Sequence, residues 1–238
     1  MAELYNKNMP GWKQDPTQLS YAGKLSDEDL LEARRKNRKI FRELVKVSTG
    51  VQLEEDRLTI GFARRFATYK RANLVFHDLE KLRQIGAGKI QFVFSGKAHP
   101  RDEGGKQLIR DIYGSAKHLE EEIPVAFLEN YDMETGLAIT SGVDIWLNNP
   151  VRPMEASGTS GMKAAMNGVP NCSILDGWWP EGCQHGVNGW AIGGPEDDRD
   201  DERDANNIYS VLENDVLPTW EKGDQIKATN KRTKNTTK

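Results

Sequence analysis

A dense group of chemically useful side chains lies between Glu155 and Lys163. These nine residues contain one carboxylate, three hydroxyls, two glycines and one lysine. Glycine permits backbone turns with positive φ, which can point successive N–H groups at one place. An apolar and small-residue run from Met162 to Val169 follows, so we predict that a helix begins near Thr159. Hydroxyls and glycines at the start of a helix favour a bound anion, most often a phosphate.

Lys163 would then lie one turn into this helix, where its amine can form a Schiff base with a carbonyl cofactor. A nucleotide P-loop is excluded, because that motif needs Gly-Lys-Ser/Thr in direct succession. Here Met162 separates Gly161 from Lys163, and Ala164 follows. A plain capped helix start is the alternative that these residues alone leave open, since Ser and Thr before an apolar run are common in α/β proteins.

A second group of candidate residues is basic and lies between Arg64 and Arg71. Arg65 and Lys70 are five residues apart in this segment. An arginine offers a planar bidentate fork for phosphate, and a lysine offers a point charge. Basic residues at the start of a helix oppose the helix dipole. A bound anion therefore explains their placement better than an ordinary basic helix start does.

The elements that must position these residues alternate between short apolar strands and helices. We expect strands over 58–63, 89–95, 123–128, 143–147 and 171–175, and helices over 69–85, 101–119, 132–140, 159–167 and 206–220. Such alternation implies right-handed βαβ crossovers and a parallel sheet. The predicted fold class is therefore α/β, a Rossmann-like parallel sheet with flanking helices. Ligands of such sheets bind beyond the carboxyl ends of the strands, which is where both candidate groups fall.

The flanking segments differ from this pattern in composition. Residues 26–50 predict a helix with a capping box at Ser26 and a stop at Gly50. The expected organisation is a polar linker over 1–25, the N-terminal helix over 26–50, a Rossmann-like cofactor-binding domain over 51–222 and a disordered tail over 223–238. Within the domain, the charge run over 196–204 is expected to be a solvated loop.

Composition narrows the possible partners. The chain has 238 residues, 33 Lys plus Arg and 36 Asp plus Glu, and a net charge of −3, so nothing directs it to nucleic acid. No apolar run approaches the roughly 18 to 20 residues that span a bilayer, and the N-terminus lacks the apolar core of a signal peptide. The four histidines and two cysteines have no metal-ligand spacing, so we expect no metal. Cys172 is predicted to be a buried free thiol, and the expected compartment is the cytoplasm.

Several ordered segments resemble one enzyme family, the α-glucan (glycogen, starch and maltodextrin) phosphorylases. The segment 155–163 resembles the family's pyridoxal-phosphate lysine segment, and 64–71 resembles its phosphate-binding arginine–lysine loop. The segments 95–100 and 127–131 also agree, and 175–182 is similar to the prokaryotic branch. The resemblance is dense from Leu58 to Gly193. Several distinctive motifs in order are far more specific than any single one.

The resemblance implies a role for each candidate residue. Pyridoxal 5′-phosphate would be attached to Lys163. Its phosphate would be bound by Thr159, Ser160 and Gly161 with help from Arg64, and Tyr131 would lie beside its ring. The catalytic residues would be Arg65 and Lys70, which hold the substrate phosphate, together with Lys163. Glucosyl hydroxyls would be contacted by the segment Glu155, Ala156, Ser157 and Gly158.

The resemblance also implies a reaction and an incomplete chain. The family performs reversible phosphorolysis of α-1,4-glucan to glucose 1-phosphate, in a cleft between two Rossmann-like domains of a GT-B fold. This sequence matches only the C-terminal, cofactor-bearing domain, so we expect the N-terminal catalytic half to be missing and the chain alone to be inactive. Two alternatives remain. One is a non-catalytic cofactor- or phosphate-binding module that needs a partner chain. The other is a nucleotide-sugar glycosyltransferase of GT-B shape, which would not need Lys163 to form a Schiff base.

Overall fold

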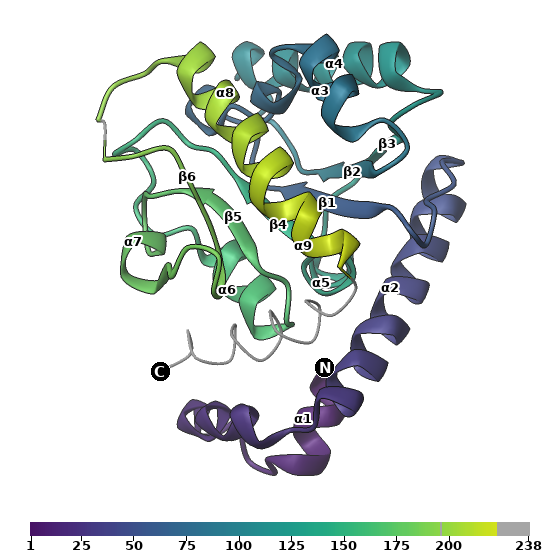
Figure 1. The fold of residues 1–238 in the computed structure, drawn as a ribbon, viewed down its shortest axis with the longest axis vertical. Helices are drawn as coiled ribbons and strands as arrows, with labels where there is room; N and C mark the ends of the chain where they lie inside the picture. The colour runs from purple at the N-terminus through teal and green to yellow at the C-terminus, as the bar shows by residue number, and fades with distance from the viewer. Residues whose placement is uncertain (196, 223–238) are drawn as a thin grey trace.

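The computed structural model describes residues 1–195 and 197–222, and its centre is a six-stranded sheet (Figure 1). The strands are β1 (Leu58–Ala63), β2 (Ile90–Ser95), β3 (Val125–Leu128), β4 (Ile145–Asn148), β5 (Asn171–Ile174) and β6 (Gly189–Ile192). Their order is β3-β2-β1-β4-β5-β6, and every neighbouring pair is parallel. This confirms the predicted α/β class with a Rossmann-like parallel sheet.

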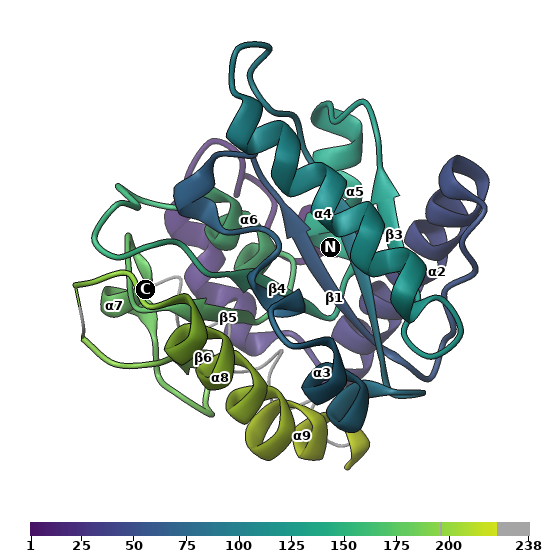
Figure 2. The same ribbon diagram turned by 90° about the horizontal axis from the view of Figure 1, so that it is seen from above.

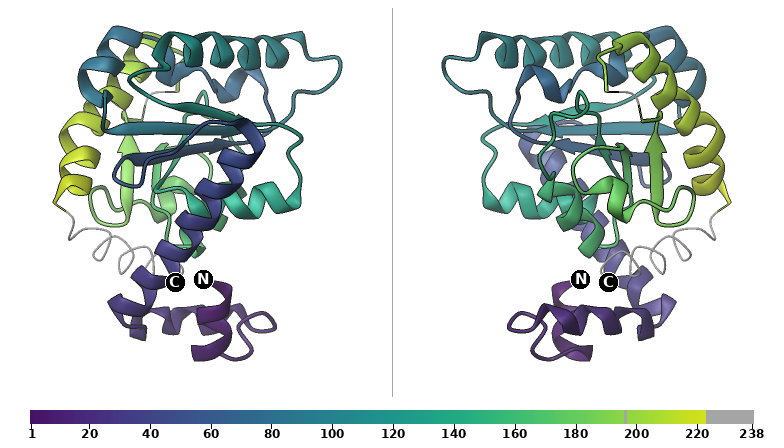
Figure 3. Two further views of the ribbon diagram at one scale, coloured as in Figure 1. Left: turned by 90° about the vertical axis from the view of Figure 1, so that its right-hand side faces the viewer. Right: turned by 90° about the vertical axis from the view of Figure 1, so that its left-hand side faces the viewer.

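Helices cover both faces of the sheet. The helical segments of the described residues are α1 (Ala2–Asn8), η1 (Pro16–Lys24), α2 (Asp27–Thr49), η2 (Thr68–Lys70), η3 (Leu74–Phe76), α3 (Leu79–Gly86), α4 (Glu103–Leu119), α5 (Met133–Gly142), α6 (Thr159–Met166), α7 (Trp179–Gly182), α8 (Asp201–Val211), the π-helical turn η4 (Leu212–Val216) and α9 (Leu217–Glu221). Helices α3, α4 and α8 pack on one face, and α2, α5 and α6 pack on the other (Figures 2 and 3).

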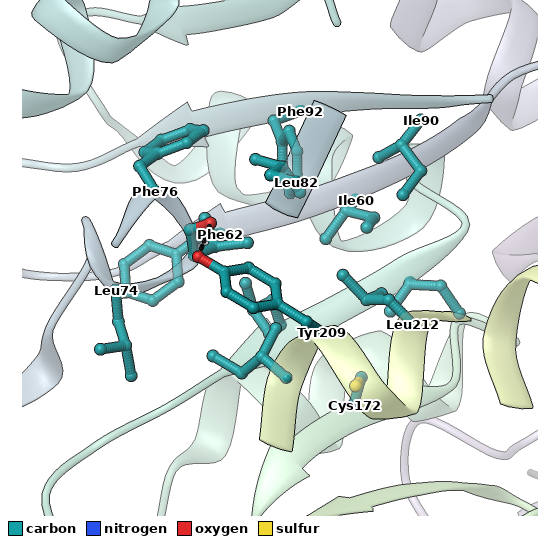
Figure 4. Packing of buried hydrophobic residues seen from close by; sticks show 14 of the residues in the cluster. Ile60, Phe62, Leu74, Phe76, Leu82, Ile90, Phe92, Cys172, Tyr209 and Leu212 are labelled. Atoms are coloured by element: carbon teal, nitrogen blue, oxygen red, sulfur yellow. Dashed lines mark hydrogen bonds between the residues drawn. The ribbon is translucent and has the colours of Figure 1, made fainter. Parts of the chain in front are cut away.

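The core under α3, α4 and α8 is rich in aromatic side chains. Phe76 lies with its ring 5.5 Å from the rings of Phe92 and Phe94. Tyr209 of α8 enters the same core, and its hydroxyl donates a hydrogen bond of 3.1 Å to the carbonyl oxygen of Val75 (Figure 4). Cys172 lies in this core as a buried free thiol, as predicted. Strands buried on both faces account for the nearly continuous apolar runs in the sequence.

Helix α2 begins and ends where its sequence predicts. The Ser26 hydroxyl accepts a hydrogen bond from the Asp29 N–H at 3.1 Å, which satisfies one of the free donors at the helix start. Gly50 ends the helix with φ 76°, a conformation that glycine adopts without steric cost. Phe41 and Val45 from its buried face reach the sheet, so α2 anchors the N-terminal part of the chain to the domain.

The linker predicted over residues 1–25 is wrong. Residues in α1 and η1 are helical, and Tyr5, Met9 and Leu19 form a small buried cluster with Leu30 of α2. The Tyr5 hydroxyl also donates a hydrogen bond of 2.7 Å to the carbonyl oxygen of Met166, at the end of α6. Sparse apolar residues in a polar segment look like a linker, but here a neighbouring element buries them.

The single helix predicted over 69–85 is also wrong, because Arg71 has φ 47° and separates η2 from η3 and α3. The predicted charged loop over 196–204 holds only in part. Helix α8 begins at Asp201, since the Asp200 carboxylate accepts the Arg203 N–H at 2.9 Å. The helix predicted over 206–220 is therefore longer, and β6 had no predicted counterpart. The tail predicted over 223–238 lies outside the described residues.

Candidate active site

The loops that follow the strands meet at one edge of the sheet because all strands run in the same direction. The loop after β1 is tied to its neighbours on both sides. The Phe66 N–H donates to the Lys97 carbonyl oxygen at 3.0 Å, and the Val151 N–H donates to the Tyr69 carbonyl oxygen at 2.7 Å. Position 96 requires glycine, because a Cβ there would overlap the Arg64 carbonyl oxygen. The predicted clustering of motifs at this edge is confirmed.

Two buried cations share one buried carboxylate at this edge. Arg64 donates to the carboxylate of Glu155 through Nη2 and to the Oδ1 of Asn148 through Nη1. The Lys70 Nζ lies 3.1 Å from the Oε2 of Glu155. The three charged residues are at most 8 % exposed. We call Arg64, Lys70 and Glu155 the ion cluster.

The backbone at Glu155 is fixed by a second buried carboxylate. The Asp176 Oδ2 accepts the N–H of Glu155 at 2.9 Å, and its Oδ1 accepts the N–H of Gly177 at 2.8 Å. The Trp178 N–H donates to the Ser157 carbonyl oxygen at 2.9 Å. Asp176 therefore holds the loop after β4 against the loop after β5, a role that its sequence position did not reveal.

The start of α6 has free backbone donors. Its N-cap residue Gly158 has φ 81° and offers no side-chain acceptor. Gly161 is buried, and a Cβ there would overlap Asn171 and lie 3.1 Å from the Trp178 Nε1, so the helix start packs tightly on the sheet. Within 1–195 and 197–222, no acceptor is recorded for the N–H groups of Thr159 and Ser160. Free N–H groups at a helix start, with hydroxyls beside them, form an anion site.

Lys163 is exposed, in contrast to Lys70. Across the described part of the chain, its ammonium group has no recorded ion pair or hydrogen bond. The ion cluster adjoins the helix of Lys163, because the Glu155 side chain lies against Gly158, with its Cγ 3.6 Å from where a Cβ of that residue would be. An accessible amine, an uncapped helix start and buried cations beside it fit a carbonyl cofactor that carries a phosphate.

The remaining candidates lie farther out. Arg65 and Ala156 are exposed, whereas Ser157 and Tyr131 are half-buried. The Tyr131 side chain packs against the core under α2 and α5, and no recorded contact joins it to the ion cluster. Among the described residues, no three His, Cys, Asp or Glu side chains are grouped so that they could hold a metal ion. No described helix is both long and apolar enough to cross a bilayer.

The parallel sheet with helices packed on both faces defines a Rossmann-like α/β domain. In a comparison with solved structures, the chain matches the crystal structure of Anabaena Alr3699/HepE in complex with UDP and glucose, with a TM-score of 0.58. The match covers 84 % of this chain and 47 % of that one, at 18 % sequence identity. At this identity the likeness concerns the fold alone.

Sequence comparison shows the family to which the chain belongs. The family model for carbohydrate phosphorylase matches residues 2–181, and the chain belongs to this family. It is 47 % identical over 216 residues to the maltodextrin phosphorylase of Thermococcus litoralis, which covers 83 % of this chain. It is 49 % identical over 183 residues to the glycogen phosphorylase of Aquifex aeolicus, which covers 75 % of this chain. The chain spans about a quarter of the length of these relatives, 26 % of each.

Proposed function

We propose that the chain is the cofactor-bearing part of an α-glucan phosphorylase. The proposed reaction is the reversible phosphorolysis of α-1,4-glucan to glucose 1-phosphate, with pyridoxal 5′-phosphate as cofactor. The observation that carries this proposal is the exposed Lys163 on a helix with an uncapped start, beside the buried cations Arg64 and Lys70. Membership of the carbohydrate phosphorylase family supports it.

The first task of the site is to hold two phosphates. The segment Thr159, Ser160 and Gly161 would bind the cofactor phosphate, chiefly through the N–H groups and hydroxyls of Thr159 and Ser160, because the Gly161 N–H already donates to the Gly158 carbonyl oxygen at 3.0 Å. Lys163 would hold the carbonyl carbon of the cofactor. Arg64 would neutralise part of its charge. The cofactor supplies a phosphate group that can exchange a proton with the substrate phosphate.

The second task is to place the substrate. Arg65 and Lys70 would grip the attacking phosphate from the loop after β1, and fixed cations offset the repulsion between two phosphates at no cost of reorganisation during the reaction. The segment from Glu155 to Gly158 would contact the glucosyl hydroxyls. The relatives are about four times longer than the matched segment, so we propose that an N-terminal half supplies the opposite wall and the remaining glucan contacts. The proposed compartment is the cytoplasm, which agrees with two unpaired cysteines in the structure.

The test is covalent labelling of Lys163. The purified chain is incubated with pyridoxal 5′-phosphate, reduced with borohydride and digested, and the labelled peptide is identified by mass spectrometry. We expect the label on Lys163 and its loss in Lys163→Ala. Lys106→Ala is the control, because Lys106 lies near the start of α4, at the same edge of the sheet, and its half-buried side chain is paired with Glu103 at 2.5 Å. Equal labelling of wild type and Lys163→Ala would refute the assignment.

A further inference from the structure

The ion cluster contains an imbalance of charge. Arg64 and Lys70 contribute two positive charges and Glu155 one negative charge, so the buried cluster keeps a net charge of one. The exposed Arg65 adds a further positive charge next to Arg64 in the chain. The carboxylate occupies the donors that a bound oxyanion would need, since it accepts from Arg64 and from Lys70.

We propose that Glu155 is an exchangeable internal anion. Its carboxylate occupies Arg64 and Lys70 until phosphate-type oxyanions take these two cations, and a single oxyanion takes both when no cofactor is bound. The Glu155 side chain then turns outward and becomes free to accept hydrogen bonds from the hydroxyls of a sugar. The exchange at the cations needs only the geometry of the ion cluster, whereas the sugar step rests on the proposed function.

Charge makes the exchange necessary. A phosphate that reached the two cations while Glu155 stayed in place would lie beside a buried carboxylate, and like charges repel strongly where little water screens them. Turning Glu155 away raises the net charge of the ion cluster from one to two, counting neither Arg65 nor the Asp176 carboxylate, which accepts from two backbone N–H groups. The site then has the positive charge that a dianion requires.

The surroundings of Glu155 allow its side chain to turn while its backbone stays fixed. Asp176 holds the Glu155 N–H at 2.9 Å, so the backbone is anchored. The side chain is flanked by Gly158 and Gly177, whose φ values are 81° and 60°. Cβ atoms there would lie 3.6 Å and 3.1 Å from the Glu155 Cγ. Because both neighbours lack side chains, no Cβ of Gly158 or Gly177 opposes a rotamer change of Glu155.

The exchange couples two ligands. An oxyanion that releases Glu155 creates an acceptor for a polyhydroxylated ligand, and by thermodynamic linkage that ligand would strengthen oxyanion binding by the same factor. The coupling would favour occupancy of the sugar position when phosphate is already bound.

The test measures phosphate binding to the 238-residue chain without cofactor. Inorganic phosphate is titrated by calorimetry into wild type, Glu155→Gln and the control Glu181→Gln, which removes an exposed carboxylate in the loop region after β5. We expect phosphate to bind Glu155→Gln roughly tenfold more tightly than wild type, a typical coupling between competing groups. The control should match wild type. Equal affinities of wild type and Glu155→Gln, or no binding to either, would overturn the proposal.

A second measurement covers the case in which Glu155→Gln does not fold. A crystal structure of the wild-type chain grown in sulfate should show sulfate on Arg64 and Lys70 and the Glu155 carboxylate turned away from both. Sulfate bound elsewhere, with the ion cluster intact, would overturn the exchange. Labelling of Lys163 is independent of both results, so a failure of the proposed function and a failure of the exchange are distinguishable.

Discussion

Arg71 and Asp204 form a buried ion pair, with 2.7 Å between Nη1 and Oδ2. The same guanidinium lies 3.0 Å from Asp201 and donates through Nε and Nη2 to the carbonyl oxygens of Asn149 and Pro150. Arg71 is 2 % exposed and follows Lys70 directly in the chain. One side chain therefore joins the loop after β1, the loop after β4 and the start of α8, and it fixes the segment that carries Lys70.

Arg71→Ala should destabilise the domain strongly. Removal of the guanidinium takes one of two arginine partners from each carboxylate and leaves two buried carbonyl groups without this donor. The loss of one member of a buried pair costs about 3 to 5 kcal/mol. Urea unfolding followed by circular dichroism measures the change. Arg110→Ala is the control, because Arg110 is 59 % exposed and lies 3.7 Å from Glu103, and such pairs contribute at most about 1 kcal/mol. A loss below about 1 kcal/mol in Arg71→Ala would contradict the role of this residue.

Gly96→Ala should be more harmful than an ordinary glycine replacement. Gly96 has φ 145°, and a Cβ there would collide with the Arg64 carbonyl oxygen and crowd Phe66. We expect a loss of more than about 2 kcal/mol in the free energy of unfolding, because a backbone clash cannot relax by rotation of a side chain.

The matched control for this substitution is Gly114→Ala. Gly114 lies inside α4, and a Cβ there meets nothing within 4 Å. Alanine in a helix interior is more favourable than glycine by about 0.5 to 1 kcal/mol, so the control should be neutral or more stable. Similar thermal midpoints for the two variants would show that the contact with Arg64 is unimportant.

Local patterns predicted the sheet and the place of the site. The strand over 58–63 was predicted with the bounds that β1 has, and the helix around Lys163 was predicted to begin at Thr159, where α6 begins. Parallel strands then bring the loops after β1 and β4 together without further information. These features depend on periodicity and on small residues at strand ends, which a single sequence contains.

The features that were missed depend on partners far away in the chain. Arg71 breaks the predicted helix over 69–85 because its guanidinium finds acceptors at Asn149 and Asp204. The acidic run over 196–204 was predicted to be a solvated loop because no residue near it in the sequence indicates that Asp201 and Asp204 pair with Arg71. The ion pair between Glu155 and Arg64 was missed for the same reason, because the two residues are 91 positions apart in the chain.

Alkaline pH should loosen the N-terminal segment. Burial raises the pKa of Tyr5 to about 12, from 10. A group whose pKa is raised in the folded state contributes stability that is present below pH 10 and is lost as the pH rises toward 12. A shift of this size corresponds to about 2 to 3 kcal/mol. Because phenylalanine cannot ionise, the free energy of unfolding of Tyr5→Phe should fall less than that of wild type between pH 10 and 12.

The control for the pH experiment is Tyr21→Phe, because Tyr21 is 51 % exposed. Its unfolding profile between pH 9 and 12 should match that of wild type. The buried Tyr209, whose pKa burial also raises to about 12, contributes equally to all three proteins, so the difference between them reports on Tyr5. Identical pH profiles for wild type and Tyr5→Phe would count against an alkaline release of α1.

The chain alone should form no detectable glucose 1-phosphate from glucan and phosphate. Its site lies at one edge of one sheet, and catalysis by closure needs a second wall that excludes water. Activity is expected only when an N-terminal half from a related phosphorylase is added, and Lys163→Ala with the same half serves as the blank. Turnover by the 238-residue chain by itself would show that the site is complete without a partner.

The strand order has a consequence for how the domain holds together. Strands β1, β2 and β3 come from one continuous segment and β4, β5 and β6 from the next, and the two sets meet at the register pairs Ile60 with Ile145 and Gly61 with Trp146. Arg64 belongs to the first segment, whereas Glu155 and α6 belong to the second. A ligand that contacts both segments would hold them together, and its binding free energy would add to the folding free energy of the domain. If the chain were cleaved between β3 and α5, the two fragments would therefore associate more completely as ligand is added. Their association would then report how much of the site is occupied.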